Sequence, residues 1–217
     1  MRARQAVIVG AGGHAVSVAE TVRSAGYELT AFTSDRDAGS RLLDRPVLAD
    51  IPDEHLAAGG IVVIAIGDNA VRADAWQRLV ARVPLDQLPA VVHASAIVAP
   101  GADLAPGAIV MQGAIIANGA RLALGSLMNT GSILEHESVL DEFASLAPRA
   151  VTGGRVRIGA RSAISIGAVI RHGLAVGADT VIGASSYVDR EMPGNVVAYG
   201  VPARVVRARV RGDAYLG

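Results

Sequence analysis

Between residues 97 and 192 an apolar residue recurs at every sixth position. Fifteen of these sixteen positions hold Val, Leu, Ile or Met, and one holds Thr: Val98, Leu104, Val110, Ile116, Leu122, Met128, Leu134, Leu140, Leu146, Thr152, Ile158, Ile164, Ile170, Val176, Ile182 and Val188. The last position of each hexad is mostly Ala, Ser or Thr. Neither an α-helix, with a period of about 3.6, nor a flat strand, with a period of about two, keeps a strict period of six.

The hexads predict a parallel β-helix shaped as a triangular prism. Each hexad supplies one short strand and one corner, with the aliphatic residue inside the prism and the small residue where the chain bends. Three hexads complete a turn, so equivalent positions stack at the inter-strand spacing of about 4.8 Å. Chance patterning in an aliphatic-rich chain is the alternative, and sixteen hexads in phase argue against it.

The first 90 residues follow a different pattern, in which apolar runs alternate with stretches of helical spacing. The predicted strands cover 6–10, 27–33 and 61–67, and the predicted helices cover 14–25 and 71–80. This alternation is typical of a small Rossmann-like α/β unit with a parallel sheet. We therefore predict two domains, an α/β domain over 1–90 and a β-helix with a C-terminal tail over 91–217.

Composition narrows the possible functions. Lys plus Arg total 20 and Asp plus Glu total 20, which argues against a nucleic-acid or anionic-membrane partner. The absence of Cys excludes disulfides, Cys-ligated zinc and thiol nucleophiles, and we expect no metal site. The N-terminal apolar run leads straight into a glycine-rich turn and is interpreted as a strand, not a signal peptide. We expect a cytoplasmic protein with no membrane span.

The glycine-rich turn GAGGHA at 10–15 fits the pattern G-x-G-x-x-[GA]. A turn of this kind leads from a strand into a helix whose N-terminal amides bind phosphate. The amides of Gly12, Gly13 and His14 are therefore candidates for a nucleotide diphosphate, with Asp35 on the ribose or base. An NAD site fits less well, because the unit is about half of a doubly wound domain. A tight turn that binds nothing is the other alternative.

Two further segments end near predicted ligand sites. IGDNAVR at 66–72 follows the third strand, so Asn69 and Arg72 are candidates for contacting a sugar or phosphate. A helix cap and a solvated helix face are the alternative. The tail leaves the repeat at Pro193, and GVPAR places Arg204 beyond the last coils, where coenzyme A phosphates could lie. An ordinary surface arginine is the alternative there.

The candidate catalytic residue is His136, which lies between Glu135 and Glu137. Acyl transfer to an amine or hydroxyl needs a base that takes a proton as the nucleophile attacks. A carboxylate beside the imidazole fixes its tautomer and stabilises the imidazolium that forms. A solvated surface histidine is the alternative. His172 has no adjacent carboxylate and is interpreted as a corner or surface residue.

These motifs resemble a family of bacterial sugar acyltransferases. The family includes sialic acid O-acetyltransferases and N-acetyltransferases of nucleotide-linked 4-amino-4,6-dideoxy sugars. The resemblance covers nearly the whole chain and is strongest at GAGGHA, IGDN with Arg72, NTGSILEHES and GVPAR. It implies a homotrimer of left-handed β-helices, a nucleotide-sugar bound by the α/β domain, and acetyl-CoA bound between adjacent prisms.

The resemblance also implies roles for individual residues. His136 corresponds to the general base and Glu137 to the residue that raises its basicity. Substrate contacts are implied for Gly12, Gly13, His14, Asp35, Asn69, Arg72 and Asn129. Acetyl-CoA contacts are implied for Ser145, Ile166, Ala184 and Arg204.

The chain departs from the family pattern at two positions. Where the family often has a histidine near the thioester, in a pattern like F-x-H, this chain has Ser145, whose hydroxyl could still donate to the thioester carbonyl. After GGHA the family often has Lys or Arg, and this chain has Val16.

The sequence thus predicts an acetyl-CoA-dependent N-acetyltransferase acting on a nucleotide-linked 4-amino-4,6-dideoxy sugar, with backbone amides stabilising the oxyanion. One alternative keeps the enzyme class and changes the acceptor to a sialic acid hydroxyl. A second alternative is a non-catalytic nucleotide-sugar-binding protein.

Overall fold

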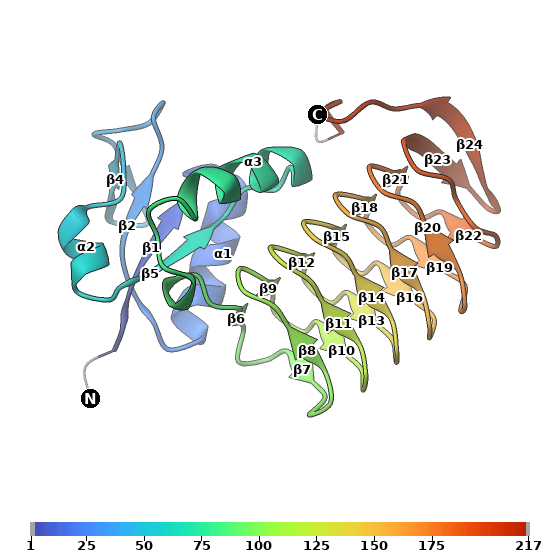
Figure 1. Ribbon diagram of the computed structural model, residues 1–217, viewed down its shortest axis with the longest axis horizontal. Coiled ribbons are helices and arrows are strands. Elements are labelled where there is room, and N and C mark those ends of the chain that lie inside the picture. The colour runs from blue at the N-terminus through green and yellow to red at the C-terminus, as the bar shows by residue number, and fades with distance from the viewer. Residues whose placement is uncertain (1–2, 216–217) are drawn as a thin grey trace.

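The computed structural model describes residues 3–215, which form an N-terminal α/β domain followed by a left-handed parallel β-helix (Figure 1). The sheet of the first domain has the order β3-β4-β2-β1-β5, and only β3 pairs antiparallel with its neighbour. Its strands are β1 (Gln5–Val9), β2 (Glu28–Thr33), β3 (Arg41–Leu42), β4 (Arg45–Leu48) and β5 (Ile61–Ile64). Its helices are α1 (Gly13–Ser24), α2 (Asp53–Ala57) and α3 (Asn69–Leu79), followed by the 3-10 turn η1 (Leu85–Gln87).

The predicted alternation of three strands and two helices is confirmed by β1, α1, β2, β5 and α3. The sequence analysis missed the short pair β3 and β4 and the one-turn helix α2. Their strands are only two and four residues long and carry exposed arginines, so they show no hydrophobic period.

The β-helix has three faces, each a ladder of two-residue parallel strands. The face that the first domain covers, called the N-domain face, contains β6 (Val91–Val92), β9 (Ile109–Val110), β12 (Leu127–Met128), β15 (Ser145–Leu146), β18 (Ala163–Ile164) and β21 (Val181–Ile182). The apolar face contains β7 (Ile97–Val98), β10 (Ile115–Ile116), β13 (Ile133–Leu134), β16 (Val151–Thr152), β19 (Val169–Ile170) and β22 (Tyr187–Val188). The charged face contains β8 (Asp103–Leu104), β11 (Arg121–Leu122), β14 (Val139–Leu140), β17 (Arg157–Ile158) and β20 (Ala175–Val176).

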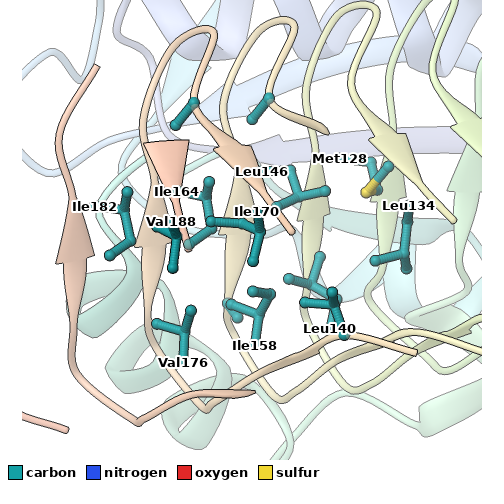
Figure 2. Close-up of a cluster of buried hydrophobic side chains, with 14 of the residues drawn as sticks. Met128, Leu134, Leu140, Leu146, Ile158, Ile164, Ile170, Val176, Ile182 and Val188 are labelled. Atoms are coloured by element: carbon teal, nitrogen blue, oxygen red, sulfur yellow. The ribbon is translucent and has the colours of Figure 1, made fainter. Parts of the chain in front are cut away.

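The hexad prediction is confirmed strand by strand. Each strand from β7 to β22 ends on the aliphatic or Thr position of its hexad, and from β9 onward that residue is buried. These side chains stack into one continuous core along the prism axis (Figure 2). At about 25 cal/mol for each Å² of apolar surface, this continuous stack is the main source of the prism's stability.

The C-terminal tail corrects one expectation. It does not leave the repeat at Pro193, because β23 (Val196–Gly200) adds a parallel strand next to β21 on the N-domain face. The chain then reverses into β24 (Ala203–Ala208), which pairs antiparallel with β23. From β24 the tail runs back toward α3 (Figure 1).

The α/β domain packs on the prism through two contacts. α1 lies over the N-domain face, where Ile109 and Leu127 join its apolar cluster. α3 lies along the corner between the charged face and the N-domain face, where Trp76 meets Phe143 edge-on at 6.2 Å between ring centroids. Gly107 makes this approach possible, since a Cβ there would lie 2.3 Å from the indole of Trp76. Close packing therefore fixes the position of the α/β domain on the prism.

Candidate active site

His136 lies at the corner where the chain passes from the apolar face to the charged face. Its Nδ1 atom is 3.4 Å from Oε2 of Glu137, and 51% of its side chain is exposed. Successive side chains on a flat strand point to opposite sides. Here Glu137 has a φ of 57°, in the left-handed region, and the resulting bend places the two side chains together.

The room for the imidazole comes from the next coil. A Cβ on Gly154 would lie 2.1 Å from Nε2 of His136, so any larger residue would displace the ring. The same coil holds Thr152, the single polar residue of the inner stack. Its Oγ1 accepts a hydrogen bond from the amide of Glu135 at 3.1 Å, where the regular ladder would use a carbonyl. The hexad that stacks on His136 therefore departs from the regular pattern at Thr152 and leaves space for the ring at Gly154.

Glu137 has a second neighbour of opposite charge. Its Oε2 lies 3.8 Å from Nη1 of Arg155, at the same corner one coil later. All three side chains are more than half exposed, so they are reached from outside the prism. The arrangement provides an accessible imidazole with a carboxylate partner, as proton transfer to and from a bound substrate requires.

A cleft of about 440 Å³ lies between the α/β domain, the prism and the C-terminal tail. It brings together five residues that the sequence analysis placed at ligands: His14, Asn129, Ser145, Ile166 and Ala184. Most of its remaining wall is small or apolar, supplied by Gly67, Leu127, Ala147, Pro148, Ala163, Ile164, Ser165 and Tyr215. We call this space the donor cleft.

His14 contributes a neutral ring to the donor cleft. Burial, with a smaller contribution from the charge of Arg72, lowers the pKa of His14 from 6.5 to about 4. Its Nε2 atom is buried without a hydrogen-bond partner among residues 3–215. A neutral imidazole with a free nitrogen can accept or donate one hydrogen bond to a ligand.

Arg72, predicted to contact a sugar or phosphate, has no N–H group left for a ligand. It is 1% exposed, and all five of its N–H groups donate to atoms of this chain. The acceptors are Gly125 O, Ile66 O, Gly67 O, Asn69 Oδ1 and Phe143 O, at 2.7–3.1 Å. Burial lowers its pKa to about 10, which leaves it charged at neutral pH. The side chain joins α3 to the prism.

Asn69 has the same structural role. It is 1% exposed, and its Nδ2 donates to Ser145 Oγ at 3.0 Å and to Ser162 O at 3.0 Å. Its Oδ1 accepts from Arg72. The helix cap that the sequence offered as an alternative is supplied by Asp68, whose carboxylate accepts from two amides of the first turn of α3. The side chain of Asn69 is therefore unavailable to a nucleotide and instead orients a residue of the donor cleft.

A second pocket, of about 770 Å³, opens at the carboxyl ends of β1, β2 and β5. Asp35, Arg36 and Arg78 are among the residues that line it. Its floor includes Gly10, which needs a φ of 115° and where a Cβ would lie 2.8 Å from a backbone oxygen. Ligands of open α/β sheets bind at this edge. We call this space the nucleotide pocket.

The amides of the turn are open to solvent beside this pocket. Gly12 and Gly13 are exposed, and a Cβ on either would meet nothing within 4 Å. They begin α1, whose N-terminal turn has no side-chain cap and no acidic residue. This leaves donors and a positive dipole end for an anion. The predicted contacts of Gly12, Gly13 and Asp35 with a nucleotide remain predictions. The exposed turn and the place of Asp35 in the pocket lining are compatible with them.

Arg204 and His136 lie outside the donor cleft of their own chain. Arg204 pairs with Asp189 at 3.2 Å and donates to Ala203 O. Its predicted contact with coenzyme A remains a prediction. His136 follows β13, whereas Asn129 precedes it, so the two sit at opposite edges of the apolar face. One chain alone does not bring the candidate base to the cleft.

Nearly the whole chain matches known structures. A family model described as the PglD N-terminal domain matches residues 5–79. A histidine-to-alanine variant of GDP-perosamine N-acetyltransferase from Caulobacter crescentus, in complex with CoA and GDP-perosamine, superimposes with a TM-score of 0.86. The two are 31% identical, and the match covers 94% of this chain and 97% of that one.

This chain belongs to that family of bacterial sugar acetyltransferases. The acetyltransferase domain of PglB from Neisseria gonorrhoeae, in complex with acetyl coenzyme A, is 29% identical with a TM-score of 0.85, over 94% of this chain and all of that one. WeeI from Acinetobacter baumannii, at 22% identity and a TM-score of 0.79, shares the fold. No curated protein sequence matches the chain.

Membership in this family confirms two predictions, the fold and the enzyme class. Sequence reasoning missed Tyr215 in the donor cleft, because a single residue in a tail outside the repeat carries no pattern. It also missed Ala163 and Pro148, which look like ordinary members of a hexad. Over residues 3–215 no helix is long and apolar enough to cross a bilayer, and no cluster of three metal-ligating side chains occurs.

Proposed function

We propose that this acetyltransferase transfers the acetyl group of acetyl-CoA to the amino group of a nucleotide-linked 4-amino-4,6-dideoxy sugar. The observation that carries the proposal is the match over nearly the full length of both chains to an enzyme holding CoA and GDP-perosamine, a nucleotide-linked amino sugar. We assign acetyl-CoA to the donor cleft and the nucleotide-sugar to the nucleotide pocket. The donor cleft is mostly apolar, and the nucleotide pocket is lined by charged side chains such as Asp35, Arg36 and Arg78.

The surface of the prism supports a homotrimer. Outward residues of the charged face form ion pairs such as Arg121 with Asp103 at 3.4 Å, and the N-domain face is already covered. The apolar face instead presents a ladder of Ile97, Ile115, Ile133, Val151, Val169 and Tyr187, of which Ile97, Val169 and Tyr187 are 63%, 41% and 37% exposed. A continuous apolar strip of this kind marks a protein–protein interface. Threefold packing of prisms covers it in a closed assembly.

Such a trimer completes the active site. His136 lies at one edge of the apolar face, and the donor-cleft residues Asn129 and Ile166 lie at its other edge. In a threefold assembly around this face, one edge of each prism meets the opposite edge of the next. His136 of one subunit then faces the donor cleft of its neighbour. Acetyl-CoA lies between the two prisms.

The chemistry uses His136 as the general base. The imidazole takes a proton from the sugar amine as its nitrogen attacks the thioester carbonyl carbon. The C=O electron pair moves to oxygen, and the tetrahedral intermediate collapses with cleavage of the C–S bond. The imidazolium returns the proton to the departing CoA thiolate. Glu137 stabilises the imidazolium during this cycle.

The nucleotide pocket favours a nucleotide-linked acceptor over a free sialic acid. Amides of Gly12 and Gly13 at the start of α1 suit a diphosphate, and Asp35 suits ribose or base hydroxyl and N–H groups. The pocket's volume of about 770 Å³ lies within the range that is typical of small-molecule sites, which favours a bound ligand over an empty turn. Because acetyl-CoA and nucleotide-sugars are metabolites of the cytoplasm, we also expect the enzyme to act there.

The test is an acetyl-CoA turnover assay with GDP-, UDP- and dTDP-linked 4-amino sugars and with free sialic acid. We expect N-acetylated product with at least one nucleotide-linked amino sugar. We expect His136→Ala to lower kcat by roughly 10²- to 10⁴-fold, with CoA affinity kept. Turnover of sialic acid alone, or full kcat in His136→Ala, would contradict the proposal.

A further inference from the structure

The C-terminal tail forms part of the donor cleft. After β24, Arg209 is 4% exposed and donates to Asp179 O at 3.0 Å and to Asp213 O at 2.7 Å. Its guanidinium stacks over the ring of Tyr215 at 5.4 Å. Arg211 pairs with Asp74 of α3 at 3.0 Å. These contacts hold the tail against α3 and place Tyr215 in the lining of the cleft.

Two hydroxyl groups meet at this wall, and Asn69 orients both. The backbone N–H of Asn69 donates to the hydroxyl oxygen of Tyr215 at 3.0 Å. Its side-chain Nδ2 donates to Oγ of Ser145 at 3.0 Å. Each hydroxyl oxygen therefore already accepts a hydrogen bond from a fixed donor. The proton of each hydroxyl must point away from Asn69.

Those two protons have weak partners within the chain. The hydroxyl of Tyr215 donates to Gly67 O at 3.3 Å, which is long for an O–H···O bond. Oγ of Ser145 accepts from Asn69, and its own proton has the hydroxyl oxygen of Tyr215 as a partner, with no carbonyl or carboxylate acceptor for it among residues 3–215. Both residues line the same cleft. A carbonyl oxygen that enters the cleft would be a better acceptor for each of these two protons than the partner that it has within the chain.

We propose that Tyr215 and Ser145 together donate hydrogen bonds to the thioester carbonyl oxygen of the acyl donor, with Asn69 as the residue that positions them. The inference rests on the proposed function, which puts acetyl-CoA in this cleft. As the amine attacks, the C=O electron pair moves to oxygen, and the two hydroxyls stabilise the negative charge that develops there. Neither hydroxyl transfers its proton. Tyr215 is then a catalytic residue contributed by the tail.

The environment keeps Tyr215 in the protonated form that donation requires. Burial raises the pKa of its hydroxyl, against smaller opposing effects of Arg72 and of hydrogen bonds from Asn69 and Ser145. The stacked Arg209 restrains the ring, so little freedom is lost when a ligand binds. A preorganised donor is the kind that stabilises a transition state most.

The test compares Tyr215→Phe with wild type in two measurements. Tyr215→Phe keeps the ring and its stacking and removes one donor, so kcat should fall by about 100-fold with KM for acetyl-CoA nearly unchanged. In calorimetry, wild type should bind acetonyl-CoA, a ketone analogue of the thioester, more tightly than CoA. Tyr215→Phe should lose this preference and bind CoA as wild type does. Tyr27→Phe, outside the cleft, is the matched control and should change neither measurement.

The two proposals fail in distinguishable ways. Unchanged kcat and an unchanged preference for the ketone in Tyr215→Phe would overturn this inference alone. Tight binding of acetonyl-CoA without turnover of any nucleotide-linked amino sugar would contradict the proposed acceptor, and the calorimetry would still decide the role of Tyr215. A rise in KM with kcat unchanged would also overturn the inference, because it would show a contact made equally in the ground state.

Discussion

At the scale of single residues, the position of the His136 ring depends on a glycine in the next coil. Gly154→Ala would place a methyl group 2.1 Å from the present position of Nε2, so the ring must turn away. We expect kcat to fall by about 10- to 100-fold with the thermal midpoint nearly unchanged, because a misplacement of about 1 Å is enough for such a loss.

Gly101→Ala is the control for this prediction. A Cβ on residue 101 would lie 2.2 Å from the side chain of Asn118, at the same corner three coils before Gly154, without touching His136. Steady-state kinetics of the two variants should therefore differ. Equal kcat values for Gly154→Ala and wild type would show that the present ring position has no catalytic importance.

His14 makes stability depend on pH. Its pKa is about 4 in the folded chain, against 6.5 for an unperturbed histidine, so the unfolded chain binds more protons between these values. The free energy of unfolding therefore falls as pH drops from 7 toward 4. From pH 7 to pH 5 this single group accounts for about 2 kcal/mol.

Urea unfolding at the two pH values measures this effect. His14→Gln should be less sensitive to the change than wild type by about 2 kcal/mol, because glutamine does not titrate. The account of His14 is wrong if His14→Gln and wild type lose equal stability.

At the scale of secondary-structure elements, α3 is held to the prism by Arg72. Arg72→Ala would remove one donor from each of five oxygens, in three buried and two partly buried hydrogen bonds. We expect a loss of roughly 3 kcal/mol or more in the free energy of unfolding. Gln77→Ala, on the exposed side of the same helix, should cost less than about 0.5 kcal/mol. A nucleotide KM that rises in Arg72→Ala without any loss of stability would instead restore its expected role as a ligand contact.

The same scale shows what the sequence could predict. The hexads determine β7 to β22 because each coil needs one apolar residue inside and one small residue at the bend, and that requirement repeats. The pair β3 and β4 could not be found, since its pairing depends on a tertiary neighbour and on exposed arginines. Asn69 and Arg72 look like ligand residues in the sequence because burial against the prism is a property of packing. Tyr215 has no sequence signal of any kind.

At the scale of the whole molecule, each face of the prism has a separate use. The N-domain face carries the α/β domain, and the charged face presents ion pairs to solvent. The apolar face is exposed. Because His136 and the donor cleft lie at opposite edges of that third face, the proposed trimer makes assembly and catalysis depend on the same surface. A monomer would hold all the required residues and no complete active site.

Subunit mixing tests this central claim most directly. His136→Ala removes the base, and Ala147→Trp fills the donor cleft. Each variant alone should be nearly inactive.

The two variants are then co-expressed with different affinity tags, so that mixed trimers form. In each mixed trimer, one of the three sites combines an intact His136 from one subunit with an intact cleft from the next. The unselected mixture should therefore recover about a quarter of wild-type activity for equal expression, whereas variants purified separately and combined without exchange should recover none. Mixed trimers no more active than either parent would contradict an active site shared between subunits.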